Sequence, residues 1–311
     1  VSCLADLGGG LVASGCTDGS FSVWDVDHGQ ALYNVAAHSA DLLGMVAVST
    51  SDERSGTRRL ATASEDKTIK LWDVVDTGAT CATTLQGHLR QVTCLAVWPP
   101  PSSCADPAAP EGLRFLASGS YDRVVRIWDM EQASCTAELK GHGHMVLCLA
   151  TFSSTGGNDG EAPDGGRRLL VASGSNDGTV RIWNAVAGAE VAKLSGHTAA
   201  VCGLAVEPAA VSEEAPRRLA SASKDRSIIM WDLPTFQPLA TLKSHTAYVR
   251  CVHFLVPGLL ASGSSDRTVR LWHVDGQRYP CLSTLQGHSD TVLHLGTCGK
   301  PGDGGARLLS A

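Results

Sequence analysis

The chain has 311 residues, of which 43% are hydrophobic and 18% are charged, so it can form a packed core and lacks the composition of a disordered chain. Its formal net charge of -6 gives no broad positive field for a phosphate backbone, which disfavours nucleic acid as the main ligand and leaves a local positive patch open. No apolar run approaches a membrane span and no signal segment opens the chain, so we expect no membrane insertion and an intracellular, cytoplasmic protein, with the nucleus or the cilium as alternatives.

One pair of residues recurs along the chain: an Asp is followed, at the sixth residue, by a Trp. The spacing is the same in all six copies, which are Asp18 and Trp24, Asp66 and Trp72, Asp122 and Trp128, Asp177 and Trp183, Asp225 and Trp231, and Asp266 and Trp272. Self-similarity at regular intervals of a few tens of residues is typical of repeat proteins.

Two further side chains recur with each pair. A Ser or Thr lies four residues before each Asp, and a His follows each Trp after 14 or 16 residues. The hydroxyl residues are Ser14, Thr62, Ser118, Ser173, Ser221 and Ser262, and the histidines are His38, His88, His142, His197, His245 and His288. Since six of the 11 histidines are periodic, a catalytic or metal-binding role for them is disfavoured.

Each repeat unit is predicted to contain four short β-strands. Residues 116–120 and 124–130 are rich in β-branched and aromatic side chains and flank a tight turn with an Asp, which predicts an antiparallel hairpin. An inner strand is expected at 92–97 and an outer strand at 135–140. No helical periodicity occurs, so we predict an all-β fold.

A four-stranded sheet leaves apolar faces and hydrogen-bonding edges exposed, so neighbouring units are expected to stack into a ring of blades. We predict a single domain over 1–311, with six complete blades at 1–36, 37–86, 87–140, 141–195, 196–243 and 244–286 and a partial seventh at 287–311. Ser310 takes the hydroxyl position of a seventh repeat whose Asp would fall after Ala311. We therefore expect a longer native protein with a seven-bladed ring; more blades or a second propeller are alternatives.

The chain resembles the WD-repeat (WD40) β-propeller family over nearly its whole length. Gly-His pairs start at residues 87, 141, 196 and 287, Trp-Asp pairs start at 24, 72, 128 and 231, and Trp-Asn and Trp-His stand at 183 and 272. The resemblance implies buried tetrads in which the Trp donates to the hydroxyl, the hydroxyl donates to the imidazole, and the imidazole donates to the Asp carboxylate. The sets are His38, Thr62, Asp66 and Trp72; His88, Ser118, Asp122 and Trp128; His142, Ser173, Asp177 and Trp183; His197, Ser221, Asp225 and Trp231; and His245, Ser262, Asp266 and Trp272.

No catalytic site, cofactor or metal site is expected. A Ser, His and Asp together could suggest nucleophilic catalysis, but five copies tied to a Trp favour a structural role. The segment 296–301 lacks the glycine spacing and the Ser or Thr of a phosphate-binding loop. Four of the 11 cysteines, Cys3, Cys94, Cys148 and Cys251, share one repeat position and no CxxC pair occurs, so we interpret them as buried thiols; metal or redox use is the alternative.

Length varies between the first and second strands of each blade, and the inserted segments lie at 51–57, 99–112, 153–166, 207–217 and 296–306. Equivalent connections emerge on one face of a ring, where these segments serve as surface padding or as a partner surface. The opposite face carries the residue before each Asp and the start of each inner strand. Similarity to the family and interface preferences lead us to predict a partner-binding patch of Tyr121, Met145, Lys224, Tyr248 and Arg250; ordinary exposure is the alternative.

These observations favour a non-catalytic scaffold or adaptor that mediates protein–protein interactions within a multi-protein complex. The partners would be other proteins or peptide motifs of unknown identity. Two alternatives remain: a chromatin- or RNA-associated reader module, and the substrate-receptor subunit of a ubiquitin ligase. An enzymatic role would require catalytic sequence outside this segment.

Overall fold

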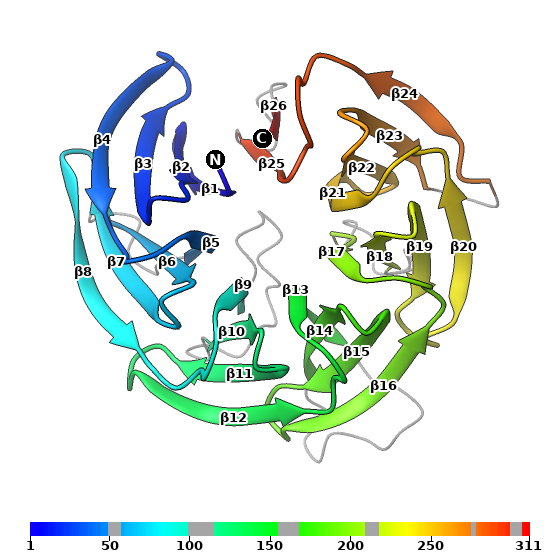
Figure 1. The fold of residues 1–311 in the computed structure, drawn as a ribbon, viewed down its shortest axis with the longest axis horizontal. Helices are drawn as coiled ribbons and strands as arrows, with labels where there is room; N and C mark the ends of the chain where they lie inside the picture. Colours follow the sequence, from blue (N-terminus) through cyan, green and yellow to red (C-terminus); the bar gives the residue numbers. More distant parts are fainter. Residues whose placement is uncertain (49–56, 99–114, 155–167, 209–217, 275–277, 299–306) are drawn as a thin grey trace.

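The computed structural model describes residues 1–48, 57–98, 115–154, 168–208, 218–274, 278–298 and 307–311. Within these ranges the chain forms strands β1 to β26 and no helix, and therefore no helix that could cross a membrane. The strands form six four-stranded sheets and one two-stranded sheet arranged in a ring (Figure 1). The predicted all-β propeller, with six complete blades and a partial seventh, is confirmed; the blade number of a full ring stays a prediction.

The strands follow one another along each antiparallel sheet, from the axis of the ring outward. Blade one contains β1 (Cys3–Gly8), β2 (Leu11–Gly15), β3 (Ser20–Asp25) and β4 (Gln30–Ala36); blade two contains β5 (Leu42–Val48), β6 (Arg58–Ser64), β7 (Ile69–Val75) and β8 (Gly78–Leu85); blade three contains β9 (Val92–Trp98), β10 (Phe115–Ser120), β11 (Val124–Asp129) and β12 (Ser134–Lys140). Blade four contains β13 (Val146–Ser154), β14 (Arg168–Ser175), β15 (Thr179–Asn184) and β16 (Ala189–Ser195); blade five contains β17 (Val201–Val206), β18 (Arg218–Ser223), β19 (Ser227–Asp232) and β20 (Pro238–Lys243). Blade six contains β21 (Val249–Val256), β22 (Leu259–Ser264), β23 (Val269–His273) and β24 (Cys281–Leu285), and the partial seventh contains β25 (Leu295–Cys298) and β26 (Arg307–Ser310).

Burial follows the position of a strand within its blade. Every residue of the second strand β10 is buried, whereas most residues of the outer strand β12 are exposed. The inner strand of each blade contacts the inner strand of the next, and β25 contacts both β21 and β1. Apolar side chains of adjacent blades share core clusters, so each sheet is stabilised by burial against its two neighbours.

The repeated cysteines lie where adjacent blades meet. Cys3 and Cys148 are buried, while Cys94 and Cys251 are half-buried as whole residues. Each sulfur packs on a glycine of the neighbouring second strand; for example, a Cβ added at Gly174 would lie 2.5 Å from Cys148 Sγ. Burial raises the pKa of the Cys3, Cys94 and Cys251 thiols to about 12, so these thiols are protonated and unreactive at neutral pH.

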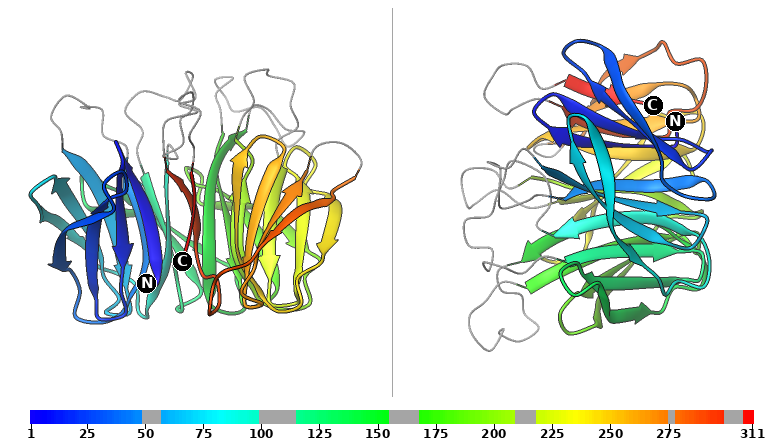
Figure 2. Two further views of the ribbon diagram at one scale, coloured as in Figure 1. Left: turned by 90° about the horizontal axis from the view of Figure 1, so that it is seen from above. Right: turned by 90° about the vertical axis from the view of Figure 1, so that its left-hand side faces the viewer.

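The two faces of the ring differ in their connections (Figure 2). First and second strands are joined on one face; the predicted inserted segments fall mostly outside the described residues. The other face carries the turns between second and third strands and the loops that precede each inner strand; we call it the tetrad face. At the turns, Lys67, Arg123, Arg226 and Arg267 have φ of 70°, 71°, 70° and 67°, and Gly178 occupies the same position with φ of 80°.

Candidate functional site

The periodic polar side chains of blade three form a continuous hydrogen-bonded chain. Trp128 Nε1 donates to Ser118 Oγ at 2.8 Å, and Ser118 Oγ lies 2.7 Å from His88 Nε2. His88 Nδ1 lies 2.8 Å from Asp122 Oδ2. A carboxylate only accepts, so Nδ1 carries the imidazole proton and Nε2 accepts from the serine hydroxyl. All four groups are thereby satisfied in the interior of the blade.

The other four predicted sets have the same geometry, with every Trp–hydroxyl, hydroxyl–His and His–Asp distance between 2.7 and 3.0 Å. They comprise His38, Thr62, Asp66 and Trp72; His142, Ser173, Asp177 and Trp183; His197, Ser221, Asp225 and Trp231; and His245, Ser262, Asp266 and Trp272. Each set joins the loop before a blade to the second and third strands of that blade.

A second row of serines, not predicted from the sequence, fixes the turn that carries each Asp. In blade three, Ser120 Oγ donates to the Arg90 carbonyl at 3.2 Å and accepts from the Asp122 amide at 3.1 Å. Equivalent bonds are made by Ser64, Ser175, Ser223 and Ser264. Each of these serines lies two residues before the tetrad Asp, and this spacing was visible in the sequence.

The pKa values of the tetrad groups follow from burial and hydrogen bonding. Burial lowers the pKa of His38, His142 and His245 below the usual value, and the neighbouring carboxylates only partly oppose this shift. Burial alone would raise the pKa of Asp122, but hydrogen bonds from His88 and from the Leu89 and Val124 amides outweigh it and lower the pKa to about 2. At neutral pH the tetrads of His38, His142 and His245 therefore hold a neutral imidazole beside an ionised carboxylate, and the carboxylate of Asp122 is ionised as well.

Acid is expected to destabilise the fold in two steps. The unfolded chain binds protons at its histidines near pH ~6.5, whereas the folded tetrads resist protonation, so the free energy of unfolding falls below that pH. The contribution of Asp122 and Asp266 is present above the pKa of an unperturbed Asp and is lost as pH falls towards their folded pKa of about 2. Urea unfolding at a series of pH values measures both steps, and a stability that stays level from about pH 8 to 5 contradicts the first.

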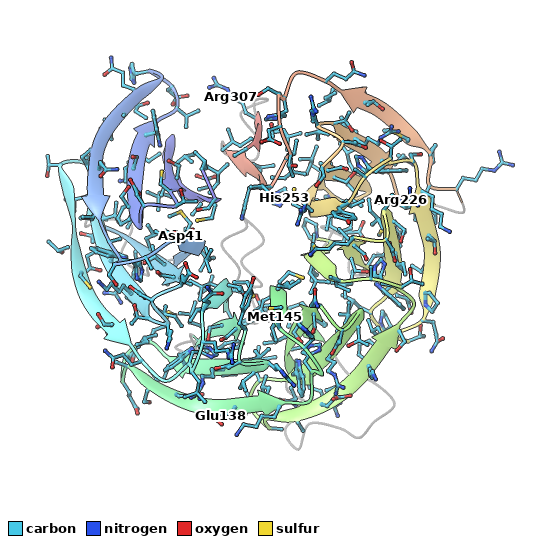
Figure 3. All side chains as sticks on the ribbon, in the orientation of Figure 1. Asp41, Glu138, Met145, Arg226, His253 and Arg307 are labelled. Carbon is cyan, nitrogen blue, oxygen red and sulfur yellow. The ribbon has the colours of Figure 1, made fainter. Side chains whose placement is uncertain are left out.

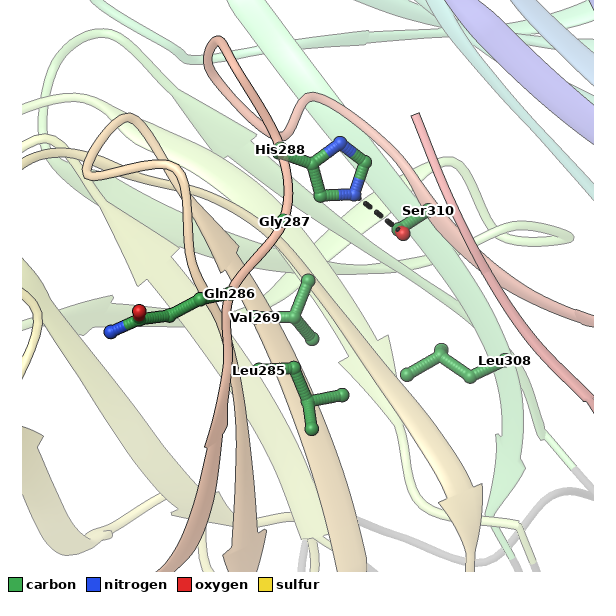
Figure 4. Close-up of a pocket in the computed structure, with 7 residues that line it drawn as sticks. All are labelled: Val269, Leu285, Gln286, Gly287, His288, Leu308 and Ser310. Atoms are coloured by element: carbon green, nitrogen blue, oxygen red, sulfur yellow. Dashed lines mark hydrogen bonds between the residues drawn. The ribbon is translucent and has the colours of Figure 1, made fainter.

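The first and last sheets carry incomplete sets. In blade one, Trp24 Nε1 donates to Ser14 Oγ at 2.7 Å, but Trp24 is 39% exposed, against 2% for Trp128. In the partial seventh blade, His288 Nε2 lies 2.7 Å from Ser310 Oγ beside a cavity of about 290 Å³ (Figure 4). The cavity is lined by Val269, Leu285, Gln286, Gly287, His288, Leu308 and Ser310.

The predicted partner-binding residues all lie on the tetrad face. Backbone hydrogen bonds link each turn to the loop beside it: the Tyr121 amide donates to the Gln91 carbonyl at 3.0 Å, and the Lys224 amide donates to the Ala200 carbonyl at 2.9 Å. The Met145 carbonyl accepts in the same way from the Asn176 amide, and the side chain of Met145 lies near the axis of the ring (Figure 3).

The structure brings two of these five residues into direct contact. The Arg250 guanidinium lies 5.6 Å from the centre of the Tyr248 ring, and its Nε donates to Ser265 Oγ at 3.1 Å. Tyr248 is 47% exposed, whereas Tyr121, Met145, Lys224 and Arg250 are half-buried. The turns and loops thus hold a stacked aromatic–cation pair in blade six, with Lys224 in blade five and Tyr121 and Met145 in blades three and four.

In the described part of the chain, no group of three or more His, Cys, Asp or Glu side chains is placed to hold a metal ion. The tetrad carboxylates are engaged instead by imidazole, hydroxyl and backbone N–H groups, as seen for Asp177. The Asp177 carboxylate thus already accepts from four donors within the fold.

A ring of repeated four-stranded blades, each tied by a Trp–hydroxyl–His–Asp chain, defines a WD-type β-propeller. The WD domain, G-beta repeat family matches residues 29–73, 79–129, 133–184, 188–232 and 236–273, so the chain belongs to the WD40 family.

Curated relatives carry names from two different cellular processes. The chain is 29% identical over 294 residues to the nuclear distribution protein PAC1 of Arthroderma otae, covering 88% of this chain and 58% of the relative. It is 30% identical over 290 residues to PAC1 of Gibberella zeae, covering 91% and 60%, respectively. It is 24% identical over 311 residues to the ribosome biogenesis protein WDR12 homolog of Drosophila erecta, covering 92% and 65%. The chain spans less than two thirds of the length of these relatives.

Proposed function

We propose that this propeller is a non-catalytic scaffold that docks other proteins or peptide segments on its tetrad face and so helps to assemble a multi-protein complex. The observation that carries the proposal is the way in which the tetrads and their backbone bonds immobilise the loops and turns on that face. Ordered loops lose little conformational entropy on binding, so they suit recognition. An intracellular, cytoplasmic location stays a prediction.

Tyr248 and Arg250 are the proposed centre of the docking surface. Tyr and Arg are frequent among residues that dominate binding energy, since each combines a large contact area with hydrogen bonding or charge. Here the guanidinium stacks near the tyrosine ring and is also held by Ser265, so both side chains are positioned before a partner arrives.

An RNA-associated role is the second candidate, supported by one relative named as a ribosome biogenesis protein. Binding to RNA depends strongly on salt because counterions are released from the phosphates. Protein docking that requires Tyr248 and survives moderate salt favours the scaffold, whereas binding to RNA that disappears as salt rises favours this alternative. A ubiquitin-ligase receptor is a special case of the scaffold and would be recognised by ligase subunits among the captured proteins.

The double variant Tyr248→Ala/Arg250→Ala is expected to lose at least about tenfold in capture of the main partner proteins, because it removes the proposed centre of the surface. The measurement is quantitative mass spectrometry of proteins retained from native lysate by the immobilised domain. The matched control is Leu239→Ala/Lys243→Ala, which removes an exposed apolar residue and a cation from the outer strand β20. Equal capture by the wild type and the Tyr248/Arg250 variant would remove this surface from consideration.

A further inference from the structure

Charge is unevenly distributed over the tetrad face. Six cations lie there in blades three, five and six: Arg90, Arg123, Lys224, Arg226, Arg250 and Arg267, which we call the cationic arc. Arg90, Arg123, Arg226 and Arg267 are exposed, and Lys224 and Arg250 are half-buried. Blade four, between them, contributes no Lys or Arg at these positions; Asn176 and His144 stand there, hydrogen-bonded at 3.2 Å.

Among the described residues, no carboxylate forms an ion pair with a side chain of the cationic arc. Elsewhere in the described residues, ion pairs to Asp or Glu are formed by Arg58, Arg59, Arg126, Lys140, Arg181, Arg218 and Arg307. None of these residues belongs to the arc. The nearest acids in sequence, such as Asp122, are engaged by the tetrad histidines and by backbone amides. None of the six cations forms an ion pair within the described residues, so each can pair with an external anion.

The acidic residues of the tetrad face that take no part in a tetrad lie outside the arc: Asp41 and Glu65 in blade two, Asp290 in the partial seventh blade and Asp18 in blade one. Asp41 and Glu65 are joined by a backbone hydrogen bond of 2.9 Å, and Glu65 also accepts from the Gln91 side chain. Lys67 at the adjacent turn is the one cation of blade two on this face within the described residues. The face is thus divided into a cationic arc and a smaller acidic sector, although the whole chain has a net charge of -6.

Lys224 and Arg250 lie on adjacent blades at the middle of the arc. The Lys224 amide donates to the Ala200 carbonyl at 2.9 Å, and three residues further on a Cβ added at Gly203 would lie 3.1 Å from the Arg250 carbonyl oxygen. Tyr248 stacks beside Arg250 and remains 47% exposed. A ligand here would meet positive charges from two adjacent blades and an aromatic surface.

We infer that the cationic arc binds an extended peptide segment rich in Asp and Glu; this inference rests on the proposed docking function and names its partner class. The carboxylates of such a segment would pair with Lys224 and Arg250 and with the exposed arginines on either side, while one apolar side chain packs on Tyr248. A long polyanion such as RNA fits less well, because it would also meet Asp41, Glu65 and the net negative field of the chain.

The test is fluorescence anisotropy with two short labelled peptides that differ only in charge: Glu alternates with Ser in one and Gln alternates with Ser in the other, each with a central Leu. We expect the Glu peptide to bind the wild-type domain about tenfold more tightly and Lys224→Glu/Arg250→Glu to abolish that advantage. Raising salt from about 50 to about 300 mM should weaken the Glu peptide selectively, since exposed charges are screened.

The matched control is Lys193→Glu/Lys243→Glu, which changes net charge equally on the outer strands β16 and β20. Circular dichroism establishes that both variants are folded. Retained binding in the control supports the inference, whereas an equal loss in both variants overturns it, because the effect then comes from net charge alone. Tighter binding of a single-stranded RNA of equal charge also overturns it.

Two further outcomes separate this inference from the proposed function. If both peptides bind equally and Tyr248→Ala/Arg250→Ala loses both, the face docks peptides without selecting charge, so the inference fails and the docking function stands. If neither peptide binds, the inference also fails, and the capture comparison decides the docking function independently.

Discussion

Replacing Asp122 with Ala is expected to lower the free energy of unfolding by about 3 kcal/mol. The carboxylate accepts from His88 Nδ1 and from the Leu89 and Val124 amides, so its removal leaves three donors without their partner. The His88 side chain is only 1% exposed, which prevents water from replacing the carboxylate easily. Urea unfolding followed by tryptophan fluorescence measures the change as a shift of the midpoint.

Blade one provides the control for this substitution. Asp18 occupies the same repeat position, but among the described residues its carboxylate accepts only from the amide and hydroxyl of Ser20, and residues 1–36 contain no tetrad His. Asp18→Ala should therefore change stability little. An effect of Asp122→Ala below about 0.5 kcal/mol, or one equal to that of Asp18→Ala, would contradict the structural role of the tetrad.

Replacing Gly174 with Ala is expected to destabilise the contact between blades four and five by about 1–3 kcal/mol. The added Cβ would lie 2.5 Å from Cys148 Sγ and 2.7 Å from Val201 Cγ1. Val201 is fully buried and its β-branched side chain is restricted at χ1, so it can yield little. The blades must move apart slightly, which weakens packing along the whole interface.

A double-mutant cycle isolates this collision. Adding Cys148→Ala to Gly174→Ala removes the closest atom, so part of the lost stability should return, and the two substitutions should be non-additive by at least about 0.5 kcal/mol. Gly78→Ala is the matched control, because a Cβ at Gly78 would meet nothing within 4 Å. Additive effects, or a similar loss for Gly78→Ala, would show that the Cys–Gly contact is not responsible.

The architecture was predictable because the tetrad requires fixed sequence spacings. Ser118 and Trp128 lie on neighbouring strands of one hairpin, in which Ser118 pairs with Arg126 and Leu116 pairs with Trp128. Any change in the number of residues in the turn would shift the register and move the indole away from the hydroxyl. Geometry of this kind leaves a periodic trace in the sequence. That trace indicated the repeated sheets, whereas the hydrogen-bonding partners followed from the resemblance to the WD-repeat family.

Other features of the site could not be obtained from the sequence. Net charge averages over the whole chain, so it concealed a cationic arc whose members extend from Arg90 to Arg267. The sequence also does not show which groups each carboxylate binds. Asp122 accepts from the tetrad histidine, whereas Glu65 accepts from a Gln side chain. The contact between Tyr248 and Arg250 was likewise not predicted, although both residues were chosen individually.

The left-handed turns of the tetrad face link stability to surface charge. Lys67, Arg123, Arg226 and Arg267 hold a backbone conformation that strains any residue with a Cβ by about 1 kcal/mol, whereas Gly178 adopts it freely. Glycine at those four positions would relieve the strain, partly offset by its greater freedom in the unfolded chain. The same exchange would remove three of the six charges of the arc, so relieving the strain of these turns with glycine would also lower the positive charge of the surface.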